Sequence, residues 1–570
     1  MKWEKSDRLM MCLGTLIIIC FYMMAIPKIY TVWNLVDEYG YLANAAYLSG
    51  AGWEAMTNFY YGYGYSLWLI PLFLVCESGI SIIRGVMIIN TIFIVLLFWV
   101  QYVLMSKLYQ EMNRKMIALV SFALCFYPYL VVSNWKVVSE CLLTLMIWVC
   151  GLVLYQALDT GKWQWYVLLG VTLSYTYFVH ARSFVFIAIL LLAVAVMYIQ
   201  KNITGKNLLI LLCSSLVLFV LGGILKSHII DVMYTNTPGG IMTGETGNTF
   251  SISYIIEKMI GFLGNLSIVD IDSFACKVFY LFIGSAGLLP LGIYTIVKDS
   301  VQQWRKEKLL TKECIIQLMY VMAVMGMVVA LEVNPMGETE GTGHYFYARY
   351  YECLMGPVIF AGAGYCMTKK VRMRELVGLV AVLLISGRFA TNLAPYLETH
   401  EIYISTGHMP ALSCLLEFVN WFEKVIEVGV IFTIGLMILL GLLSIFKRLR
   451  WAVPVVLLSL FMLSNIWNVL FVVRINGANM AEYQVANYIH ENYDAEEIYF
   501  LNDDSNAVLA YTKIQSLLGN VKVDVVNPED AGKIQSREWF VTLQFNPYVS
   551  EMAETEMVLK QGCYEVYVVD

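Results

Sequence analysis

The sequence predicts an all-α polytopic membrane protein with about thirteen transmembrane helices and a small external α/β domain at the C-terminal end. Hydrophobic residues make up 59% of the 570 residues and charged residues only 14%, whereas soluble proteins carry roughly 25% charged residues. Apolar stretches of the length that crosses a bilayer, about 20 residues, recur along most of the chain. Clusters of Lys and Arg separate many of these stretches, as expected for cytoplasmic loops.

The same composition excludes several classes of protein. A chain with so few charges is neither a soluble enzyme nor a disordered protein. The 37 Lys and Arg residues nearly balance the 43 Asp and Glu residues, so no basic field would attract nucleic acid. The 13 cysteines contain no C-x-x-C pair and most lie in apolar runs, which predicts packing residues and not disulfides or a metal centre.

The positive-inside rule orients the predicted spans. Lys2, Lys5 and Arg8 precede the first apolar stretch and place the N-terminus in the cytoplasm, and the C-terminus then lies outside. The predicted spans are residues 9 to 30, 84 to 106, 116 to 134, 137 to 157, 164 to 180, 183 to 200, 206 to 226, 277 to 297, 313 to 332, 351 to 368, 375 to 393, 425 to 446 and 452 to 473.

Residues 62 to 77 are the ambiguous segment. They are short for a span, rich in aromatic residues, and interrupted by Pro71, so we predict an interfacial or re-entrant helix. Counting them as a fourteenth span would move the basic clusters WRKEK, KKVRMR and KRLR to the outside, against the positive-inside rule.

This pattern divides the chain into four parts. Residues 1 to 230 form a first transmembrane module, whose first external loop is 31 to 83. The Gly- and Thr-rich residues 231 to 275 form an external loop that is a candidate lid. Residues 276 to 474 form a second transmembrane module. In residues 475 to 570, two helical patterns and the strand-like runs EIYFL, VKVDVV, WFVTLQF and YEVYVVD predict the α/β domain.

Two adjacent acids, Asp37 and Glu38, directly follow the first span and open a helix-like stretch. A carboxylate held where the membrane meets water can take a proton from an acceptor hydroxyl or amine, which is the work of a general base. The alternative is a pair of solvated acids favoured by the dipole of a helix start.

The acidic pair, followed by Y-x-x-x-A and a small-residue turn, resembles the first external loop of GT-C membrane glycosyltransferases. The branch concerned contains the protein O-mannosyltransferases and the lipid A aminoarabinose transferases. The resemblance covers roughly residues 1 to 230. It implies seven conserved spans around the loop, a donor sugar carried on a polyprenyl phosphate, and Asp37 as the base with Glu38 beside it.

Cations near the external span ends are candidates for binding the donor phosphate, because a departing phosphate is anionic and Arg can donate two parallel hydrogen bonds to it. The A-R-Y-Y-E stretch is similar to an arginine-tyrosine element before a late span in bacterial relatives, which favours Arg349. The alternative is snorkelling at the interface or a structural role. The candidates for phosphate binding are Arg349, Arg182, Lys136 and His180.

A further set of residues has the chemistry of an acceptor site or lid: Tyr61, Tyr63, Glu338, Glu340, His344 and Tyr350. The acids and histidine of NPMGETEGTGHY could meet Asp37 around a divalent ion, but their spacing matches no standard metal motif. We therefore predict no metal and no other cofactor, with a divalent ion as the alternative.

Together these features predict a hexosyl or pentosyl transferase in a bacterial cytoplasmic membrane, active at its external face. It would move a sugar from a polyprenyl-phosphate donor to a cell-envelope polymer, a glycolipid or a protein hydroxyl, with inversion. The first alternative is a transporter or lipid flippase, which would need polar residues near the middle of several spans. The second is a non-catalytic scaffold of envelope assembly.

Overall fold

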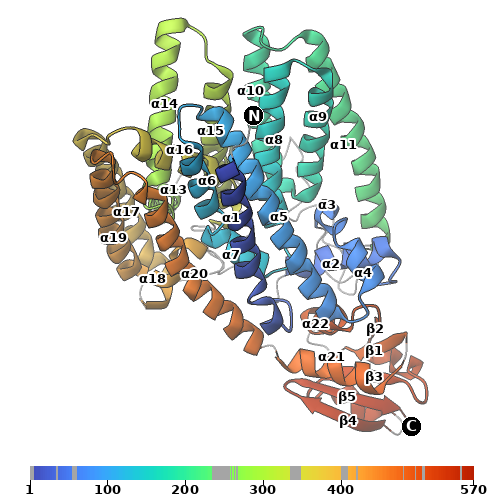
Figure 1. Ribbon diagram of the computed structural model, residues 1–570. Coiled ribbons are helices and arrows are strands. Elements are labelled where there is room, and N and C mark those ends of the chain that lie inside the picture. The colour runs from blue at the N-terminus through green and yellow to red at the C-terminus, as the bar shows by residue number, and fades with distance from the viewer. Residues whose placement is uncertain are drawn as a thin grey trace.

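The computed structural model shows a helical bundle with a small mixed α/β domain at one end (Figure 1). It describes the chain except residues 1–4, 34–35, 54–60, 234–256, 258–259, 262–263, 265–267, 334–347, 400–408, 419–421, 479, 495, 503–507, 553–554 and 570. The candidate lid at 231 to 275 therefore lies largely outside the described residues.

The first transmembrane module contains a helix at each of its seven predicted spans. These are α1 (Lys5–Met23), α5 (Gly79–Leu108), α6 (Arg114–Leu124) with α7 (Pro128–Asn134), α8 (Glu140–Thr160), α9 (Trp163–Val179), α10 (Phe184–Ile199) and α11 (Gly205–Met233). The pair α6 and α7 bends by 52°. Pro128 begins α7 and has no backbone N–H to continue the ladder of α6, which explains the break.

The first external loop folds into short helices. After the 3₁₀ turn η1 (Ile26–Lys28), it forms α2 (Val36–Ser49), α3 (Tyr63–Ser66) and α4 (Ile70–Val75). Residues 62 to 77 are thus two short helices and no continuous one. Pro71 lies in the first turn of α4, where its missing N–H costs nothing. That this segment does not cross the membrane stays a prediction.

The second transmembrane module follows the predicted spans with one exception. Its helices are α13 (Ile268–Ile283), α14 (Leu288–Glu307), α15 (Lys312–Val333), α16 (Arg349–Thr368), α17 (Met373–Thr399), α18 (Ser413–Phe418), α19 (Phe422–Ile445) and α20 (Ala452–Ala478). The continuous span predicted at 277 to 297 is instead the pair α13 and α14, bent by 97°. Ala286 and Gly287 have φ of 53° and 76°, and these left-handed residues end the helix.

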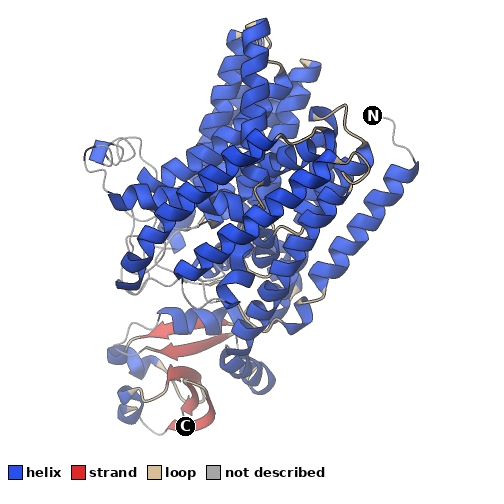
Figure 2. Ribbon diagram, turned by 90° about the vertical axis from the view of Figure 1, so that its left-hand side faces the viewer, coloured by secondary structure: helices blue, strands red, loops and turns tan. Residues whose placement is uncertain are grey.

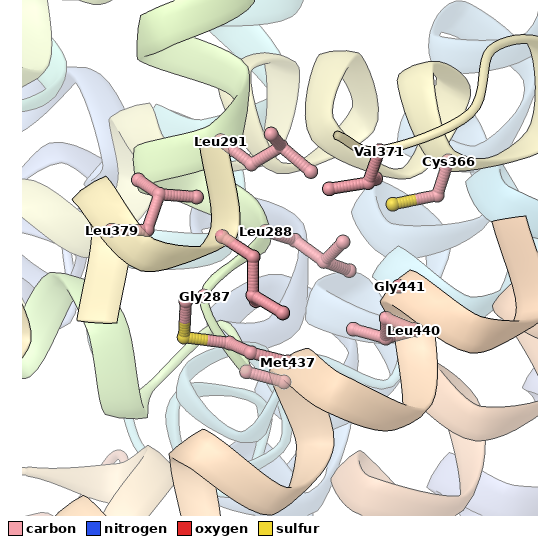
Figure 3. A pocket seen from close by; sticks show the side chains of 11 residues that line it. Gly287, Leu288, Leu291, Cys366, Val371, Leu379, Met437, Leu440 and Gly441 are labelled. Carbon is pink, nitrogen blue, oxygen red and sulfur yellow. The ribbon is translucent and has the colours of Figure 1, made fainter. Parts of the chain in front are cut away.

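An apolar pocket lies beside this bend (Figure 3). It is lined by residues that include Gly287, Leu288, Cys366, Met437 and Leu440. Gly287 is required there, because a Cβ would lie 2.6 Å from Met437 Cγ. Cys366 lies near the end of α16, about 25 Å along the helix from its first residue, so the pocket is far from the start of α16.

In the described part of the chain, nine helices are long and apolar enough to cross a membrane, or eleven if each bent pair is one span. The two remaining predicted spans correspond to α9, which has 17 residues, and α16. α16 is buried along almost its whole length, so protein and not lipid surrounds it. Figure 2 shows the helices packed against one another, with the strands gathered at the end of the molecule that holds the C-terminus. The protein is a multi-pass membrane protein, and the count of thirteen spans stays a prediction.

The C-terminal domain is a five-stranded mixed sheet with helices. Its elements are α21 (Met480–Asn492), β1 (Glu497–Leu501), α22 (Val508–Leu518), β2 (Lys522–Val526), η5 (Pro528–Lys533), β3 (Trp539–Leu543), η6 (Pro547–Glu551), β4 (Thr555–Gln561) and β5 (Tyr564–Val569). The strand order is β2-β1-β3-β5-β4. β1 pairs in parallel with β2 and β3, and β5 is antiparallel to β3 and β4.

Figure 1 places this domain and the N-terminal end of α1 at opposite ends of the bundle. If the N-terminus is cytoplasmic, the domain is external. Cys563 lies in the turn between β4 and β5 and is exposed. We expect a membrane-impermeant maleimide to label Cys563 in intact cells, and a Cys563→Ser variant to show the background. Labelling of Cys563 only after permeabilisation would reverse the topology.

Candidate active site

Asp37 lies in the first turn of α2, where the helix dipole favours a carboxylate. Its side chain keeps 23% of its surface exposed. The Oδ2 atom accepts a hydrogen bond of 2.6 Å from Nη2 of Arg349, the first residue of α16. The fold thus brings together two predicted site residues that are 312 positions apart in the sequence.

Arg349 continues into a buried chain of ion pairs. Its Nε atom donates to Oε1 of Glu140 at 2.5 Å, and Glu140 begins α8. The same Oε1 accepts a hydrogen bond of 3.1 Å from Nη2 of Arg182. Neither the Glu140 nor the Arg182 side chain is exposed by more than 1%. One buried carboxylate therefore holds two guanidinium groups, which would otherwise repel each other.

Arg182 has unused hydrogen-bonding capacity. Its Nη2 also approaches the Tyr129 hydroxyl at 3.5 Å, and its guanidinium lies 5.0 Å from the centre of the Tyr350 ring. Its Nε and Nη1 atoms have no hydrogen-bond partner among the described residues. Buried donors without partners are costly and rare in native proteins, and a ligand with anionic oxygens would satisfy them.

Glu38 faces a different part of the protein from Asp37. Its side chain is fully buried, and Oε1 accepts a hydrogen bond of 3.0 Å from the backbone N–H of Val137. This contact ties α2 to the connection between α7 and α8. The placement of Glu38 therefore favours a supporting role over proton abstraction from a substrate.

Lys136 lies in the same connection, with its Nζ atom 3.9 Å from the centre of the Trp33 ring. Burial and, after it, the Arg349 guanidinium lower the pKa of Lys136 to about 8. The carboxylates of the site oppose this shift. Lys136 is therefore charged below pH 8 and loses its charge as the pH rises through that value.

We expect this titration to appear in donor binding. If Lys136 helps to bind the donor phosphate, KM for the donor rises above pH 8, because the neutral amine no longer attracts the anion. Lys136→Arg keeps its charge in that range and should remove the inflection. The check is KM for the donor from pH 6.5 to 9.5 in both proteins. An inflection that persists in Lys136→Arg would assign the titration to another group.

His180 lies next to the ion-pair chain but forms a hydrogen bond and not an ion pair with it. Its Nδ1 atom accepts a hydrogen bond of 3.3 Å from the backbone N–H of Arg182. A nitrogen that accepts carries no proton, so this imidazole is neutral. His180 therefore shapes the short turn η2 (Ala181–Ser183) that carries Arg182, and a neutral imidazole attracts an anion less than a guanidinium group does.

Tyr61 and Tyr63 of the first loop contact different parts of the protein. Tyr61 packs beside α2, and a Cβ on Gly40 would lie 2.2 Å from its ring, so only glycine allows this contact. Burial and the neighbouring Asp37 carboxylate raise the pKa of Tyr61 well above its usual range, so its hydroxyl stays protonated. Tyr63 is turned away, donating to the Gly222 carbonyl at 3.2 Å and stacking on Phe178.

Three predicted residues, Glu338, Glu340 and His344, lie outside the described residues. Among the residues that the structure does describe, no group of three His, Cys, Asp or Glu side chains could hold a metal ion. The positive charges near Asp37 are those of Arg349, Arg182 and Lys136, and the Glu38 and Glu140 carboxylates lie among them.

Comparison with solved structures identifies the architecture. The crystal structures of ArnT from Cupriavidus metallidurans, one bound to undecaprenyl phosphate and one in the apo state, both align with a TM-score of 0.55. Each alignment covers 98% of this chain and 97% of ArnT, at 10% and 11% sequence identity respectively. The chain has the GT-C fold of ArnT. The resemblance predicted from the first loop is thus confirmed at the level of the fold.

Another solved structure aligns less well with this chain. The Archaeoglobus fulgidus oligosaccharyltransferase aligns over 93% of this chain and 65% of its own, at 13% identity, but with a TM-score of only 0.41. No protein-family model matches the sequence, and neither does any curated protein. The similarity to the GT-C fold of ArnT is therefore visible in three dimensions and not in the sequence as a whole.

The role of Glu140 in this site could not be predicted from its sequence context. It reads as an ordinary acid at a helix start, since it precedes the apolar run CLLTLMIWVC. A fully buried carboxylate needs a cationic partner, but no local pattern names one. The signal in the sequence was the presence of Arg182 and Arg349 near other external span ends, and we interpreted both as phosphate ligands and not as partners of Glu140.

Proposed function

We propose that this protein is a membrane glycosyltransferase that uses a polyprenyl-phosphate sugar as its donor. The observation that carries the proposal is the chain of ion pairs from Asp37 through Arg349 and Glu140 to Arg182. It joins one partly exposed carboxylate to two arginines at the same site. A transfer from a lipid phosphate needs both, a base for the acceptor and cations for the departing phosphate.

In the proposed reaction, Asp37 takes a proton from an acceptor hydroxyl or amine. The acceptor oxygen or nitrogen attacks the anomeric carbon of the donor sugar. The bond between that carbon and the phosphate oxygen breaks, and the electron pair leaves with the phosphate. Attack opposite to the leaving group inverts the anomeric configuration.

The arginines suit the leaving phosphate in two ways. Arg182 has two donor atoms without partners in the described part of the chain, and Arg349 lies between it and the proposed base. Buried guanidinium groups attract an anion more strongly than exposed ones, because water screens them less. Glu140 keeps the two cations together before the donor arrives.

The comparison supports the donor class. ArnT, whose fold this chain shares, was crystallised with undecaprenyl phosphate. We infer a phosphate on a long isoprenoid for this chain as well. A bacterial cytoplasmic membrane, with the site at its external face, is the proposed location. A cell-envelope polymer, a glycolipid and a protein hydroxyl remain the proposed acceptors.

The distribution of charge also favours an enzyme over a transporter. Asp37, Glu140, Arg182 and Arg349 all lie at or within three residues of a helix N-terminus and not at the middle of a span. A transporter or flippase would need polar side chains along its path through the membrane. These four charged residues are instead joined at one place by their ion pairs.

The test is incubation of the purified protein with a panel of lipid-linked sugars, with release of the lipid phosphate and transfer of the sugar measured separately. We expect one donor class to be hydrolysed slowly without acceptor and rapidly with it. Envelope extracts serve as the source of acceptor. If lipid-linked sugars bind but none in the panel is cleaved, the result would favour the transporter or the scaffold.

We expect this activity to persist in excess EDTA, because arginines and not a divalent ion would meet the phosphate charge. The measurement is the rate of transfer before and after chelation, with Mg²⁺ or Mn²⁺ added back. Activity that disappears with EDTA and returns with the ion would assign a metal. It would also bring Glu338, Glu340 and His344 forward as its ligands.

A further inference from the structure

The helix that carries Asp37 has a second face, which points away from the ion-pair chain. Asp37 and Tyr41 are four residues apart and share one side of α2, where the Tyr41 hydroxyl lies 2.9 Å from Ser139 Oγ. Tyr39 lies two residues from Asp37, so it projects from the opposite side. It is fully buried, and besides Glu38 of its own helix its polar neighbours come from the C-terminal domain.

Those neighbours form a polar group beneath α2. The Tyr39 hydroxyl lies beside Thr512 of α22, the helix that packs against α2, and Glu482 and Tyr564 lie close to it. Glu482 is itself held by Lys513, at 3.0 Å. Figure 1 shows α22 between the sheet of the C-terminal domain and the helices of the first loop. The back of the helix that bears Asp37 is therefore built from residues more than 400 positions away in the chain.

The segments on both sides of α2 are held in the same way. Before the helix, the backbone N–H groups of Tyr30 and Thr31 donate to Oδ1 of Asn476, near the end of α20 that leads into the C-terminal domain, at 3.1 and 3.2 Å. After the helix, the Trp53 indole N–H donates to the Gly519 carbonyl at 2.6 Å. α2 is thus held at its entrance, at its back and at its exit.

Two glycines allow the backbones to meet at this place. A Cβ on Gly519, which has φ of +66°, would lie 2.7 Å from the backbone nitrogen of Gly79. A Cβ on Gly79 would lie 2.1 Å from the Ser516 carbonyl. The end of α22 and the start of α5 are therefore in direct backbone contact, and Ile514 and Leu517 belong to the same hydrophobic core as the bundle.

We propose that the C-terminal domain sets the position of Asp37 by holding the back of α2, and that Thr512, Trp53 and Gly519 are positioning residues for sugar transfer. We call the contacts of Tyr39, Trp53, Thr512 and Gly519 the α2 support. The kinetic part of this inference rests on the proposed function. A displacement of about 1 Å at a reacting group can cost on the order of 100-fold in rate, so the support acts on kcat.

The experiment compares three threonine variants of the full-length protein. Thr512→Val removes the hydroxyl at the α2 support, and Thr512→Ser keeps it. Thr542→Val is the matched control: Thr542 is equally buried in the same domain, but its hydroxyl donates to the Leu501 carbonyl at 2.9 Å, within the sheet. Hydrogen exchange of residues 36 to 49 reports the mobility of α2, and kcat and donor KM report the reaction.

In Thr512→Val we expect exchange of α2 to be faster by about 5- to 10-fold, because a polar contact behind the helix is lost. We also expect kcat to fall by at least about 10-fold with donor KM near the native value. Thr512→Ser and Thr542→Val should behave like the native protein in both measurements. Trp53→Phe is a second variant, since it keeps the aromatic contact with Phe73 and removes only the N–H donor.

Native exchange of α2 in both Thr512→Val and Trp53→Phe would overturn the inference. Equal effects of Thr512→Val and Thr542→Val would also overturn it, because the cause would then be the stability of the whole domain. A third result is faster exchange of α2 in the variants with no transfer activity in any protein, the native one included. This result would contradict the proposed function but would still support the role of the C-terminal domain in holding α2.

Discussion

Asp37→Asn is expected to lower kcat by on the order of 10²- to 10⁴-fold, with donor KM little changed. Asn has nearly the same size as Asp and can still accept the hydrogen bond from Arg349, but it cannot take a proton from the acceptor. The loss should therefore fall on the chemical step. The measurement is steady-state transfer with the donor identified from the panel of lipid-linked sugars.

Glu38→Gln provides the comparison within the same helical turn. Gln can still accept the hydrogen bond from the Val137 N–H, so we expect a loss of kcat below about 10-fold. Both proteins must first show native thermal unfolding in detergent. Full transfer activity in folded Asp37→Asn would end the assignment of Asp37 as the base, and a larger loss in Glu38→Gln would transfer that role to Glu38.

Arg349→Ala is expected to affect both binding and catalysis. The donor phosphate is anionic before and during the reaction, so donor KM should rise. The arginine should also stabilise the charge that develops as the phosphate leaves, so kcat should fall. We expect a combined loss of kcat/KM on the order of 10³-fold. Separate determination of kcat and donor KM distinguishes this pattern from that of Asp37→Asn.

Removing Arg349 also leaves Glu140 with one cationic partner, and breaking a buried ion pair can cost about 3 to 5 kcal/mol in stability. Arg349→Lys keeps the charge but has a single nitrogen, which cannot reach both Glu140 and Asp37 as Nε and Nη2 do. It should fold and still lose activity. Arg450→Ala is the control at the far end of α16, where Arg450 donates to the Thr368 carbonyl. Native kcat/KM in folded Arg349→Lys would contradict the role proposed here.

Much of the fold follows from patterns that are local in the sequence. The apolar runs that became α1, α5 and α11 are long, continuous and bounded by polar residues, so hydropathy alone predicts them. The break between α13 and α14 is different, because it depends on Ala286 and Gly287 adopting left-handed conformations beside Met437 of α19. The sequence patterns also did not predict strand β4. It is an edge strand with no fully buried residue, and its polar and apolar residues do not alternate.

The sequence by itself determined that this is a membrane protein, that Asp37 and Glu38 begin a helix after the first span, and that Arg182 and Arg349 lie at span ends. These are properties of composition and of neighbours within a few residues, which hydropathy and charge patterns report. Only the tertiary structure decided that Asp37 and not Glu38 faces Arg349, that Glu140 joins the two arginines, and that Thr512 lies behind α2. Those contacts join residues that are 42 to more than 400 positions apart. The packing of the helices decides which of these residues meet. A buried charge shows that a partner must exist, but the packing of the helices decides which one it is.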